Sequence, residues 1–191
     1  MYERGLGVPR DYGEAVKWYR KAAEQNNPSA QYHLGSMYGG MYVTQNLREA
    51  TNEELKWYRK AAEQNNPKAQ WNLGFKYEIG SGVTKDYGEA VKLYRKAAEQ
   101  NDPWGQFSMG EMYEKGQGVT QDYGEALKWY HKAAEQNDET AQDKLGWMYE
   151  TGRGVTQDYG EAVKWYRKAA EQGNSHAKAW LTRHHLKTSK H

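Results

Sequence analysis

The sequence predicts an all-α fold, a solenoid in which similar pairs of helices stack one after another. The first observation is a repeat: the string Tyr-Arg-Lys-Ala-Ala-Glu-Gln, or a close variant, begins at Tyr19, Tyr58, Tyr94, Tyr130 and Tyr166, at intervals of 39, 36, 36 and 36 residues. The second is that the repeats carry two separate helix-start signals. Such units bury their apolar faces only against neighbours, so function is expected on an extended surface rather than in one deep pocket.

The first helix of a pair is specified at both ends, as the unit from Asn101 to Gln136 shows. Asp102 can cap the free backbone amides, and Pro103 suits the first helical position because it lacks an amide proton. Gly116 and Gly118 can adopt the left-handed backbone that closes a helix. The same start signal recurs at Asn27-Pro28 and Asn66-Pro67.

The second helix of a pair begins at a capping-box pattern, in which Asp122 precedes Glu125 by three residues. This pattern recurs at Asp11/Glu14, Asp86/Glu89 and Asp158/Glu161. Apolar residues then follow at helical spacing, which marks a stripe for packing against neighbouring helices. In the last such helix the stripe consists of Ala162, Val163, Tyr166, Ala169 and Ala170.

These signals divide the chain into one continuous array without a second domain. Residues Met1–Val8 align with Met112–Val119, which lie in the middle of a repeat. The chain is therefore expected to begin inside a repeat, as a fragment would. The expected divisions are residues 1–26 (the end of one unit with its second helix), 27–65 (a unit with a loop three residues longer), 66–100, 101–136 and 137–172 (regular units), and 173–191 (a degenerate capping helix and tail).

Composition and charge exclude several classes of partner and cofactor. The 27 basic and 25 acidic residues give a net charge of +2 without a basic stripe, which argues against nucleic acid. The absence of cysteine excludes disulfides and thiolate metal sites, and no apolar run is long enough for membrane insertion. His184 and His185 are adjacent and diverge on a helix, so no metal site is expected.

The repeated positions also resemble a known family. Ala30 to Tyr38 reads Ala-Gln-x-x-Leu-Gly-x-Met-Tyr, and Gly152 to Gln172 contains Gly-x-Gly-Val, Asp-Tyr-x-x-Ala, Trp-Tyr and Ala-Ala-Glu-Gln. Over nearly the whole chain this pattern resembles the Sel-one-like repeat (SLR) family. Its structural repeat positions here are Gly35, Gly74, Gly110, Gly146, Tyr38, Tyr77, Tyr113 and Tyr149.

The resemblance implies helix-turn-helix units related to tetratricopeptide repeats, wound into a right-handed superhelix. It further implies a scaffold or adaptor in bacterial signalling, envelope assembly or contact with host proteins. By this resemblance alone, a bacterial periplasmic or secreted location is favoured over a cytoplasmic one.

Two regions depart from the family pattern. Gly39-Gly40-Met41-Tyr42 replaces the Gly-x-Gly step, and Asn52 and Glu54 replace the usual Gly and Ala, which should weaken packing or change the angle between adjoining units. At the other end, Thr182, His184 and His185 replace Gly, Met and Tyr. A terminal helix with a polar outer face is what a capping element requires.

Comparison of the units separates the positions that the fold requires from those that it leaves free. Four aligned columns vary, and their spacing of 0, 3, 4 and 7 residues places them on one face of the first helix. In related superhelices the first helices line the concave side, so these columns are expected to line a groove. They are Ser29/Lys68/Trp104/Thr140, Tyr32/Trp71/Phe107/Asp143, His33/Asn72/Ser108/Lys144 and Ser36/Phe75/Glu111/Trp147.

Aromatic side chains on this face predict a recognition surface for a protein or peptide, because such rings often dominate binding energy. The column Tyr32/Trp71/Phe107 has a second interpretation, as core between the two helices, whereas Trp104, Phe75 and Trp147 are expected to face the partner. The predicted partner-binding residues are Tyr32, His33, Trp71, Phe75, Trp104, Phe107, Glu111, Asp143, Lys144 and Trp147.

No pattern in the sequence predicts a catalytic residue or a cofactor. Ser175 to Lys178 matches the Ser-x-x-Lys motif of penicillin-interacting enzymes, and a cysteine-rich branch of the family is associated with penicillin binding. The accompanying Ser-Asp-Asn and Lys-Thr-Gly elements are missing, so Ser175 is expected to mark only a helix start. The Gly-x-Gly steps lack the residues that would complete a phosphate loop.

The leading hypothesis is therefore a non-catalytic scaffold that binds a protein or peptide on its aromatic face. The alternative is a structural spacer or assembly segment of a larger envelope or signalling protein, and a penicillin-interacting enzyme is a distant third. The sequence leaves the oligomeric state open, with a monomer favoured.

Overall fold

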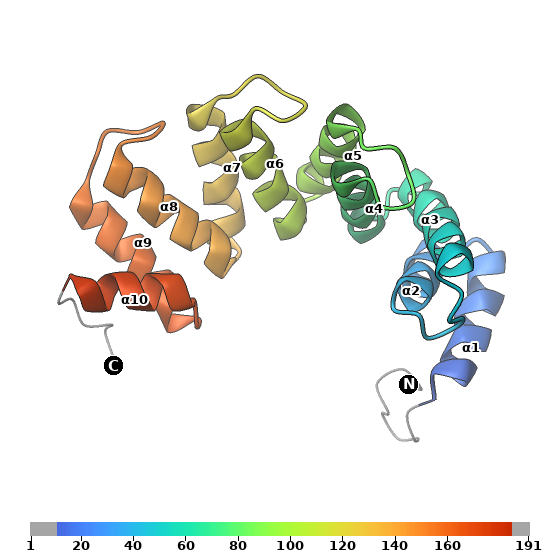
Figure 1. Cartoon of the computed structure of the whole chain (residues 1–191). Helices are drawn as coiled ribbons and strands as arrows, with labels where there is room; N and C mark the ends of the chain where they lie inside the picture. Colours follow the sequence, from blue (N-terminus) through green and yellow to red (C-terminus); the bar gives the residue numbers. More distant parts are fainter. Residues whose placement is uncertain (1–10, 185–191) are drawn as a thin grey trace. The chain divides into compact units, whose positions relative to one another are not determined.

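The computed structural model describes residues 11–184, and this range contains ten α-helices and no strand (Figure 1). The fold is an all-α helical-repeat solenoid, as predicted. The expectations for Met1–Val8 and His185 lie outside the described residues. The helices are α1 (Tyr12–Glu24), α2 (Pro28–Gly39), α3 (Leu47–Glu63), α4 (Pro67–Ile79), α5 (Tyr87–Glu99), α6 (Pro103–Lys115), α7 (Tyr123–Glu135), α8 (Glu139–Thr151), α9 (Tyr159–Glu171) and α10 (Ser175–Arg183).

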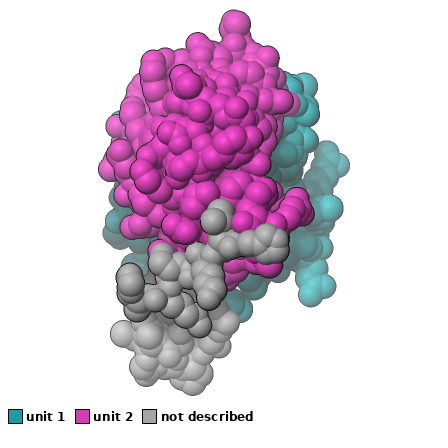
Figure 2. All heavy atoms as spheres, turned by 90° about the vertical axis from the view of Figure 1, so that its left-hand side faces the viewer, with its two compact units in different colours: residues 1–97 teal, residues 98–191 magenta. Residues whose placement is uncertain are grey.

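Even-numbered helices are the first members of the predicted pairs, and we call them A helices; odd-numbered helices are the second members, or B helices. The chain forms two compact units, residues 1–97 and residues 98–191 (Figure 2). In the first unit α2 packs on α1 and α3, and α4 packs on α3. In the second unit the helices from α6 to α10 each pack on the next one along the chain. Each unit is thus built from contacts between consecutive helices.

The predicted start signals cap the helices. Asn27, Asn66 and Asp102 accept hydrogen bonds from the backbone amides three residues ahead, at 2.9, 3.0 and 2.9 Å. Asp122 accepts from the amide of Glu125 at 3.0 Å, and the side chain of Glu125 forms an ion pair with Lys128. These side chains satisfy amides that the first helical turn leaves without partners.

The helix ends use the left-handed backbone at two kinds of residue. Gly80, Gly116 and Gly152 end A helices with φ of 76, 67 and 69°. B helices are followed by asparagines in the same region, which Asn tolerates better than most side chains. These are Asn26, Asn65, Asn101 and Asn137, with φ of 68, 61, 65 and 64°.

The A helices α2, α4, α6 and α8 each lie close to the B helix that follows through one glycine and one tyrosine. A Cβ atom on Gly110 would lie 2.5 Å from the Tyr130 ring, and one on Gly146 would lie 2.7 Å from the Tyr166 ring. Real Cβ atoms do not approach other atoms this closely, so the repeat requires glycine here. Gly35 with Tyr58 and Gly74 with Tyr94 form the same contact, at 2.8 and 2.9 Å.

A buried glutamine connects each of several A helices to the B helices before and after it. Gln142 donates to the carbonyl of Ala134 in α7 at 3.2 Å and accepts from Gln172, which caps α9, at 2.6 Å. Gln31 does the same with Ala23 and Gln64, at 3.1 and 2.7 Å. The Ala-Gln pair of the repeat thus links three consecutive helices.

The three extra residues of the 27–65 unit lie in a helix, and the expectation of a longer loop is wrong. Residues 40–46 connect α2 to α3, and residues 80–86, a segment of equal length, connect α4 to α5. Instead, α3 has 17 residues where α5 has 13. The reason is Asn46, which caps α3 about one turn earlier by accepting from the amides of Arg48 and Glu49.

Glu54, expected to disturb packing, has a specific partner. Its carboxylate accepts from Lys76 Nζ of α4 at 2.8 Å, and both side chains are largely buried. It also fills the space beside Gly39, where a Cβ atom would collide with the carboxylate. The later repeats have a Glu at the position of Gly39 and an Ala at the position of Glu54. In the 27–65 unit the B helix therefore supplies the carboxylate that the A helix supplies in the later repeats.

The glycine–tyrosine contact predicts a strong difference between two glycines of one repeat. We expect Gly110→Ala to lower the free energy of unfolding by about 1 to 3 kcal/mol, because Tyr130 is held on its far side and the added methyl overpacks the contact. Gly124→Ala, whose Cβ atom would meet only Asp122 Oδ1 at 3.2 Å, should change it by less than about 1 kcal/mol. Urea unfolding followed by circular dichroism measures both, and equal effects would contradict the assigned role of Gly110.

Candidate functional site

The ten predicted partner-binding residues differ in exposure. Trp104 on α6 exposes 47% of its surface and Phe75 on α4 exposes 41%. The other eight are half-buried. The rings of Phe75 and Trp71 stack on one another, with centroids 5.9 Å apart. Each unit therefore presents an exposed aromatic side chain on an A helix.

The column Tyr32/Trp71/Phe107 lies at the margin of the helix contacts. The Tyr32 ring centroid is 6.0 Å from that of Tyr58, and Phe107 is 5.5 Å from Tyr130. Tyr32 and Phe107 thus extend the packing around the two glycine contacts while keeping part of their surface in solvent. His33 stacks on Tyr19, with centroids 5.0 Å apart.

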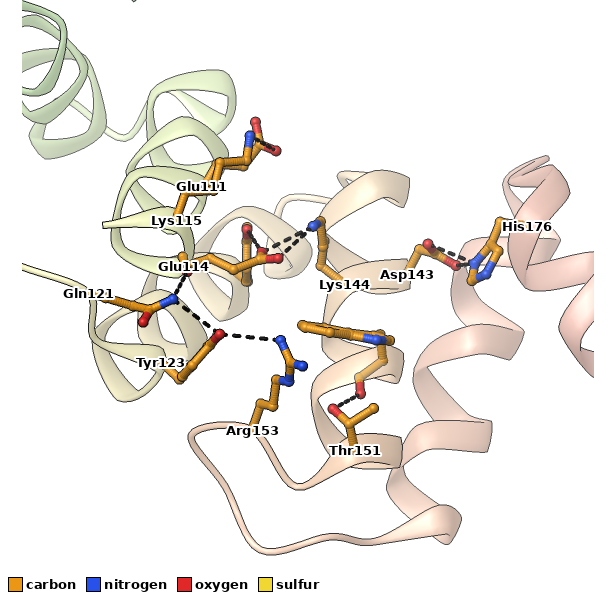
Figure 3. A network of polar contacts seen from close by, with 12 residues as sticks. Glu111, Glu114, Lys115, Gln121, Tyr123, Asp143, Lys144, Thr151, Arg153 and His176 are labelled. Atoms are coloured by element: carbon orange, nitrogen blue, oxygen red, sulfur yellow. Dashed lines mark hydrogen bonds and ion pairs between the residues drawn. The ribbon is translucent and has the colours of Figure 1, made fainter. Parts of the chain in front are cut away.

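Glu114 is the centre of a polar network in the second unit (Figure 3). It accepts from Lys144 Nζ at 3.0 Å through both carboxylate oxygens and from the Tyr130 hydroxyl at 2.5 Å. Burial, strengthened by this bond to a carboxylate, raises the pKa of Tyr130 far above its ordinary value. Tyr130 therefore remains a neutral donor, and α6, α7 and α8 meet at one carboxylate.

The same arrangement recurs one repeat later. Glu150 accepts from the Tyr166 hydroxyl at 2.8 Å and from Trp180 Nε1 of α10 at 3.0 Å. In the first unit Glu78 accepts from the Tyr94 hydroxyl at 2.6 Å. This acidic column was missed in the sequence, although its period of 36 residues is visible there; the signal was a repeated Glu directly after the A-helix tyrosine.

Trp147 is bordered by two cationic side chains. The Arg153 guanidinium carbon lies 4.7 Å from the Trp147 ring centroid, and Lys144 Nζ lies 5.7 Å from it. Arg153 also donates to the Tyr123 hydroxyl at 3.2 Å, as Figure 3 shows. Arg153 was not among the residues predicted from the sequence, although it stands where the two preceding repeats have Ser and Gln. Trp147 is thus held inside the second unit by contacts from a neighbouring loop.

The three predicted acidic and lysine residues on this face, Glu111, Asp143 and Lys144, all have partners within the chain. Asp143 pairs with His176 Nδ1 of α10 at 2.8 Å, and Lys144 pairs with Glu114. Glu111 pairs with Lys115, one turn ahead on α6, at 2.9 Å. Figure 3 shows these pairs on successive A helices. A partner would have to displace these contacts before it could use the charges.

His131 occupies the B-helix position that holds Arg in the other four repeats. Its ring meets Trp165 of α9 and Tyr149 of α8 edge-on, with centroids 5.4 and 6.2 Å away. Burial is the main cause that lowers the pKa of His131, with Lys168 adding to it and the carboxylates of Glu135 and Glu161 opposing it. The fold therefore favours the neutral imidazole.

Ser175, the serine of the Ser-x-x-Lys match, is the exposed first residue of α10. Asn174 caps this helix by accepting from the amide of Ala177 at 2.9 Å. Over residues 11–184, no group of three or more His, Asp or Glu side chains is arranged to hold a metal ion. None of the helices in this range has the length and apolar character to cross a bilayer.

The Sel1 repeat profile matches residues 1–27, 28–66, 67–102, 105–138 and 140–174. The chain belongs to the Sel1 repeat family. This confirms the family resemblance stated for the sequence. Sel1 repeat proteins are in general scaffolds for protein interactions, and their fold is typically non-catalytic.

Solved structures of Sel1 repeat proteins agree closely with this one. A Sel1 repeat protein from Oxalobacter formigenes is 43% identical, with a TM-score of 0.86 over 95% of this chain and 73% of that chain. A protective antigen of uropathogenic Escherichia coli with an SLR fold is 41% identical, with a TM-score of 0.85 over 100% of this chain and 41% of that chain.

The similarity to a curated protein is confined to a short segment. Over 37 residues the chain is 51% identical to DAP3-binding cell death enhancer 1 of Rattus norvegicus. The match spans 19% of this chain and 7% of the length of that protein. It is as long as about one repeat.

The Glu114 network makes a prediction about stability. We expect Glu114→Ala to lower the free energy of unfolding by about 1 to 3 kcal/mol, because it leaves the buried Tyr130 hydroxyl without an acceptor and Lys144 without its ion pair. Glu111→Ala removes a more exposed pair within one helix and should cost less than about 0.5 kcal/mol. Urea unfolding of both variants would show the difference; equal losses would mean that Glu114 does not connect the helices.

His131 makes a prediction about pH. The unfolded chain takes up a proton on this residue near pH 6.5, about its ordinary pKa, whereas the folded chain does so only at a lower pH. Its contribution to stability is therefore complete above about pH 6.5 and is lost as the pH falls through the folded pKa. Between about pH 7.5 and about pH 5.5, the free energy of unfolding should fall more for the wild-type chain than for His131→Gln. Parallel pH profiles in urea unfolding would contradict this.

Proposed function

We propose that this Sel1 repeat protein is a non-catalytic scaffold that binds an extended segment of a protein partner on its A helices. The observation that supports it is the exposure of Phe75 and Trp104, at 41% and 47%, on the helix face that varies from repeat to repeat. The glycines, tyrosines and glutamines that build the repeat stay constant while this face changes. A helix face that varies from repeat to repeat and carries exposed aromatic side chains is expected of a recognition surface.

The chemistry of the face favours apolar anchoring. Aromatic side chains bury roughly 150 to 250 Å² each, and anchors of this kind often carry most of the binding energy. Glu111, Asp143 and Lys144 are engaged in ion pairs within the chain, so they are proposed to border the bound segment and set its register. Trp71 supports Phe75 from one turn away by stacking, which limits the ordering cost when a partner binds.

The half-buried members of the face have a supporting role in this proposal. Trp147 is fixed by Arg153 and Lys144, and Tyr32 and Phe107 pack beside the helix contacts, so only their outer edges are offered to a partner. His33 lies against Tyr19 in the same way. The partner-facing residues expected from the sequence thus divide into one exposed anchor in each compact unit, Phe75 in the first and Trp104 in the second, and half-buried residues of the same units.

The test uses partner capture and affinity measurement. The chain is used to capture proteins from extracts of its source cells and from host extracts, and each captured protein is then titrated against purified variants. Phe75→Ala and Trp104→Ala should each weaken binding about tenfold or more, because truncation of an aromatic anchor removes well over 1 kcal/mol. Trp18→Ala is the matched control, because Trp18 exposes 57% of its surface but lies on a B helix.

Thermal unfolding by circular dichroism verifies that the variants remain folded. Affinity that survives Phe75→Ala and Trp104→Ala but is lost with Trp18→Ala would overturn the assignment to the A helices. An array that captures no partner and self-associates in sedimentation would favour the structural spacer instead.

A further inference from the structure

A second site is suggested by an arginine and a tyrosine that form a hydrogen bond in one repeat but not in the next. Arg20 of α1 donates to the hydroxyl of Tyr38 in α2 at 2.5 Å. The equivalent residues 39 positions later are Arg59 of α3 and Tyr77 of α4. In the part of the chain that the structure describes, the Arg59 guanidinium and the Tyr77 hydroxyl have no hydrogen-bond or ion-pair partner.

A lysine nearby has also lost the structural role of its counterparts. In the later repeats the position equivalent to Lys85 is a glutamine. Gln121 donates to the carbonyl of Glu114 at 2.8 Å and to the Tyr123 hydroxyl at 3.1 Å. Gln157 repeats the pattern at 2.7 and 3.1 Å. Lys85 stands in their place, and its Nζ lies 4.6 Å from the centroid of the Tyr87 ring. The cation is therefore not required to hold the loop.

These groups share one hollow, which we call the loop hollow. Its volume is about 490 Å³, and its lining consists of Arg59, Tyr77, Gly82, Val83, Thr84, Lys85 and Asp86. The hollow lies wholly within the first unit, between α3, the end of α4 and the loop that precedes α5. Gly82, in the left-handed backbone at φ 73°, brings this loop against Thr51 and Leu55 of α3, where a Cβ atom would collide.

We propose that the loop hollow binds a carboxylate of a protein partner. A guanidinium, an ammonium and the hydroxyls of Tyr77 and Thr84 together supply donors to an oxyanion, and hydrogen bonds between charged groups are the strong ones. The Thr84 hydroxyl, like that of Tyr77, has no hydrogen-bond partner within residues 11–184. An anion would satisfy these donors together.

The charge of the lining selects a carboxylate over a phosphate. Arg59 and Lys85 are positive and Asp86 is negative, so the lining carries one net positive charge. Asp86 accepts from the amide of Glu89 at 3.0 Å and caps α5, which keeps its carboxylate directed to the helix. A carboxylate brings the site to neutrality, whereas a phosphate dianion would leave an excess negative charge beside Asp86.

The loop hollow is independent of the aromatic face. Tyr77 and Phe75 are two positions apart on α4, and residues at that spacing point to different sides of a helix. A partner could occupy either surface alone. Failure of the carboxylate proposal therefore leaves the function proposed for the A helices unaffected, and the reverse also holds.

The test is a nuclear magnetic resonance titration of the full chain at constant ionic strength. The probes are acetyl-Gly-Glu-Gly-amide, which has a side-chain carboxylate; acetyl-Gly-Gln-Gly, which has a C-terminal carboxylate; acetyl-Gly-Gln-Gly-amide, which has neither; and inorganic phosphate. We expect saturating shifts in the Arg59 Nε–H signal and in the amides of residues 82–85 with at least one carboxylate peptide. The uncharged peptide should produce none, and the better of the two carboxylate peptides identifies the source of the group.

Variants test the assigned residues. Arg59→Gln and Lys85→Gln should each weaken the binding about tenfold or more, as expected for loss of one charged hydrogen bond. Lys85→Gln introduces the residue found at positions 121 and 157, so the loop should keep its fold. Arg20→Gln is the matched control and should leave the affinity unchanged, because Arg20 already donates to Tyr38.

Three results would overturn the proposal. Shifts that do not saturate, or that do not change in Arg59→Gln and Lys85→Gln, would show that the loop hollow is not a binding site. Equal weakening by Arg20→Gln would show that the loss of affinity follows the overall charge of the protein rather than contacts in the loop hollow. Tighter binding of inorganic phosphate than of either carboxylate peptide would overturn the choice of ligand.

Discussion

The close approach of one glycine and one tyrosine in each helix pair governs much of this structure. Because Gly110 has no side chain, the Tyr130 ring can lie against the backbone of α6 and be fully buried. A buried hydroxyl needs a partner, since an unsatisfied one costs about 1 to 3 kcal/mol. Glu114 supplies the acceptor, and its carboxylate in turn binds Lys144 of the next A helix. The contact inside one pair thus leads to the connection with the next.

The glutamines complete this connection at the other end of the helices. Gln142 joins the end of α7 to the end of α9, while Glu150 joins α8 to α9 and α10. Since both devices use side chains at fixed repeat positions, consecutive helices within a compact unit pack in a regular way. The first unit tolerates an exception: Glu54 restores the carboxylate that Gly39 lacks, and Lys76 neutralises it. The requirement is for a paired carboxylate at this place rather than for a Glu at one position.

Function is proposed at side chains that differ between repeats and are not part of the repeated glycine, tyrosine, glutamine and glutamate contacts. Phe75 and Trp104 stand on the varying face of the A helices, while Arg59 and Lys85 occupy positions whose counterparts hydrogen-bond within the fold. A repeat protein offers an internal comparison of this kind, because equivalent positions share one backbone geometry. A side chain that no longer serves the framework in one unit is therefore a candidate for recognition.

The sequence by itself determined the helix pairs, their caps and the glycine turns, because a cap such as Asn27 depends on amides within three residues of it. It also located the face that varies. Only the tertiary structure decided that the extra residues of the 27–65 unit lengthen α3, that Lys144 pairs with Glu114 30 positions earlier, and that Arg59 has no hydrogen-bond or ion-pair partner among residues 11–184. These outcomes depend on which helices pack together and how closely, and that information is spread over residues far apart in the chain.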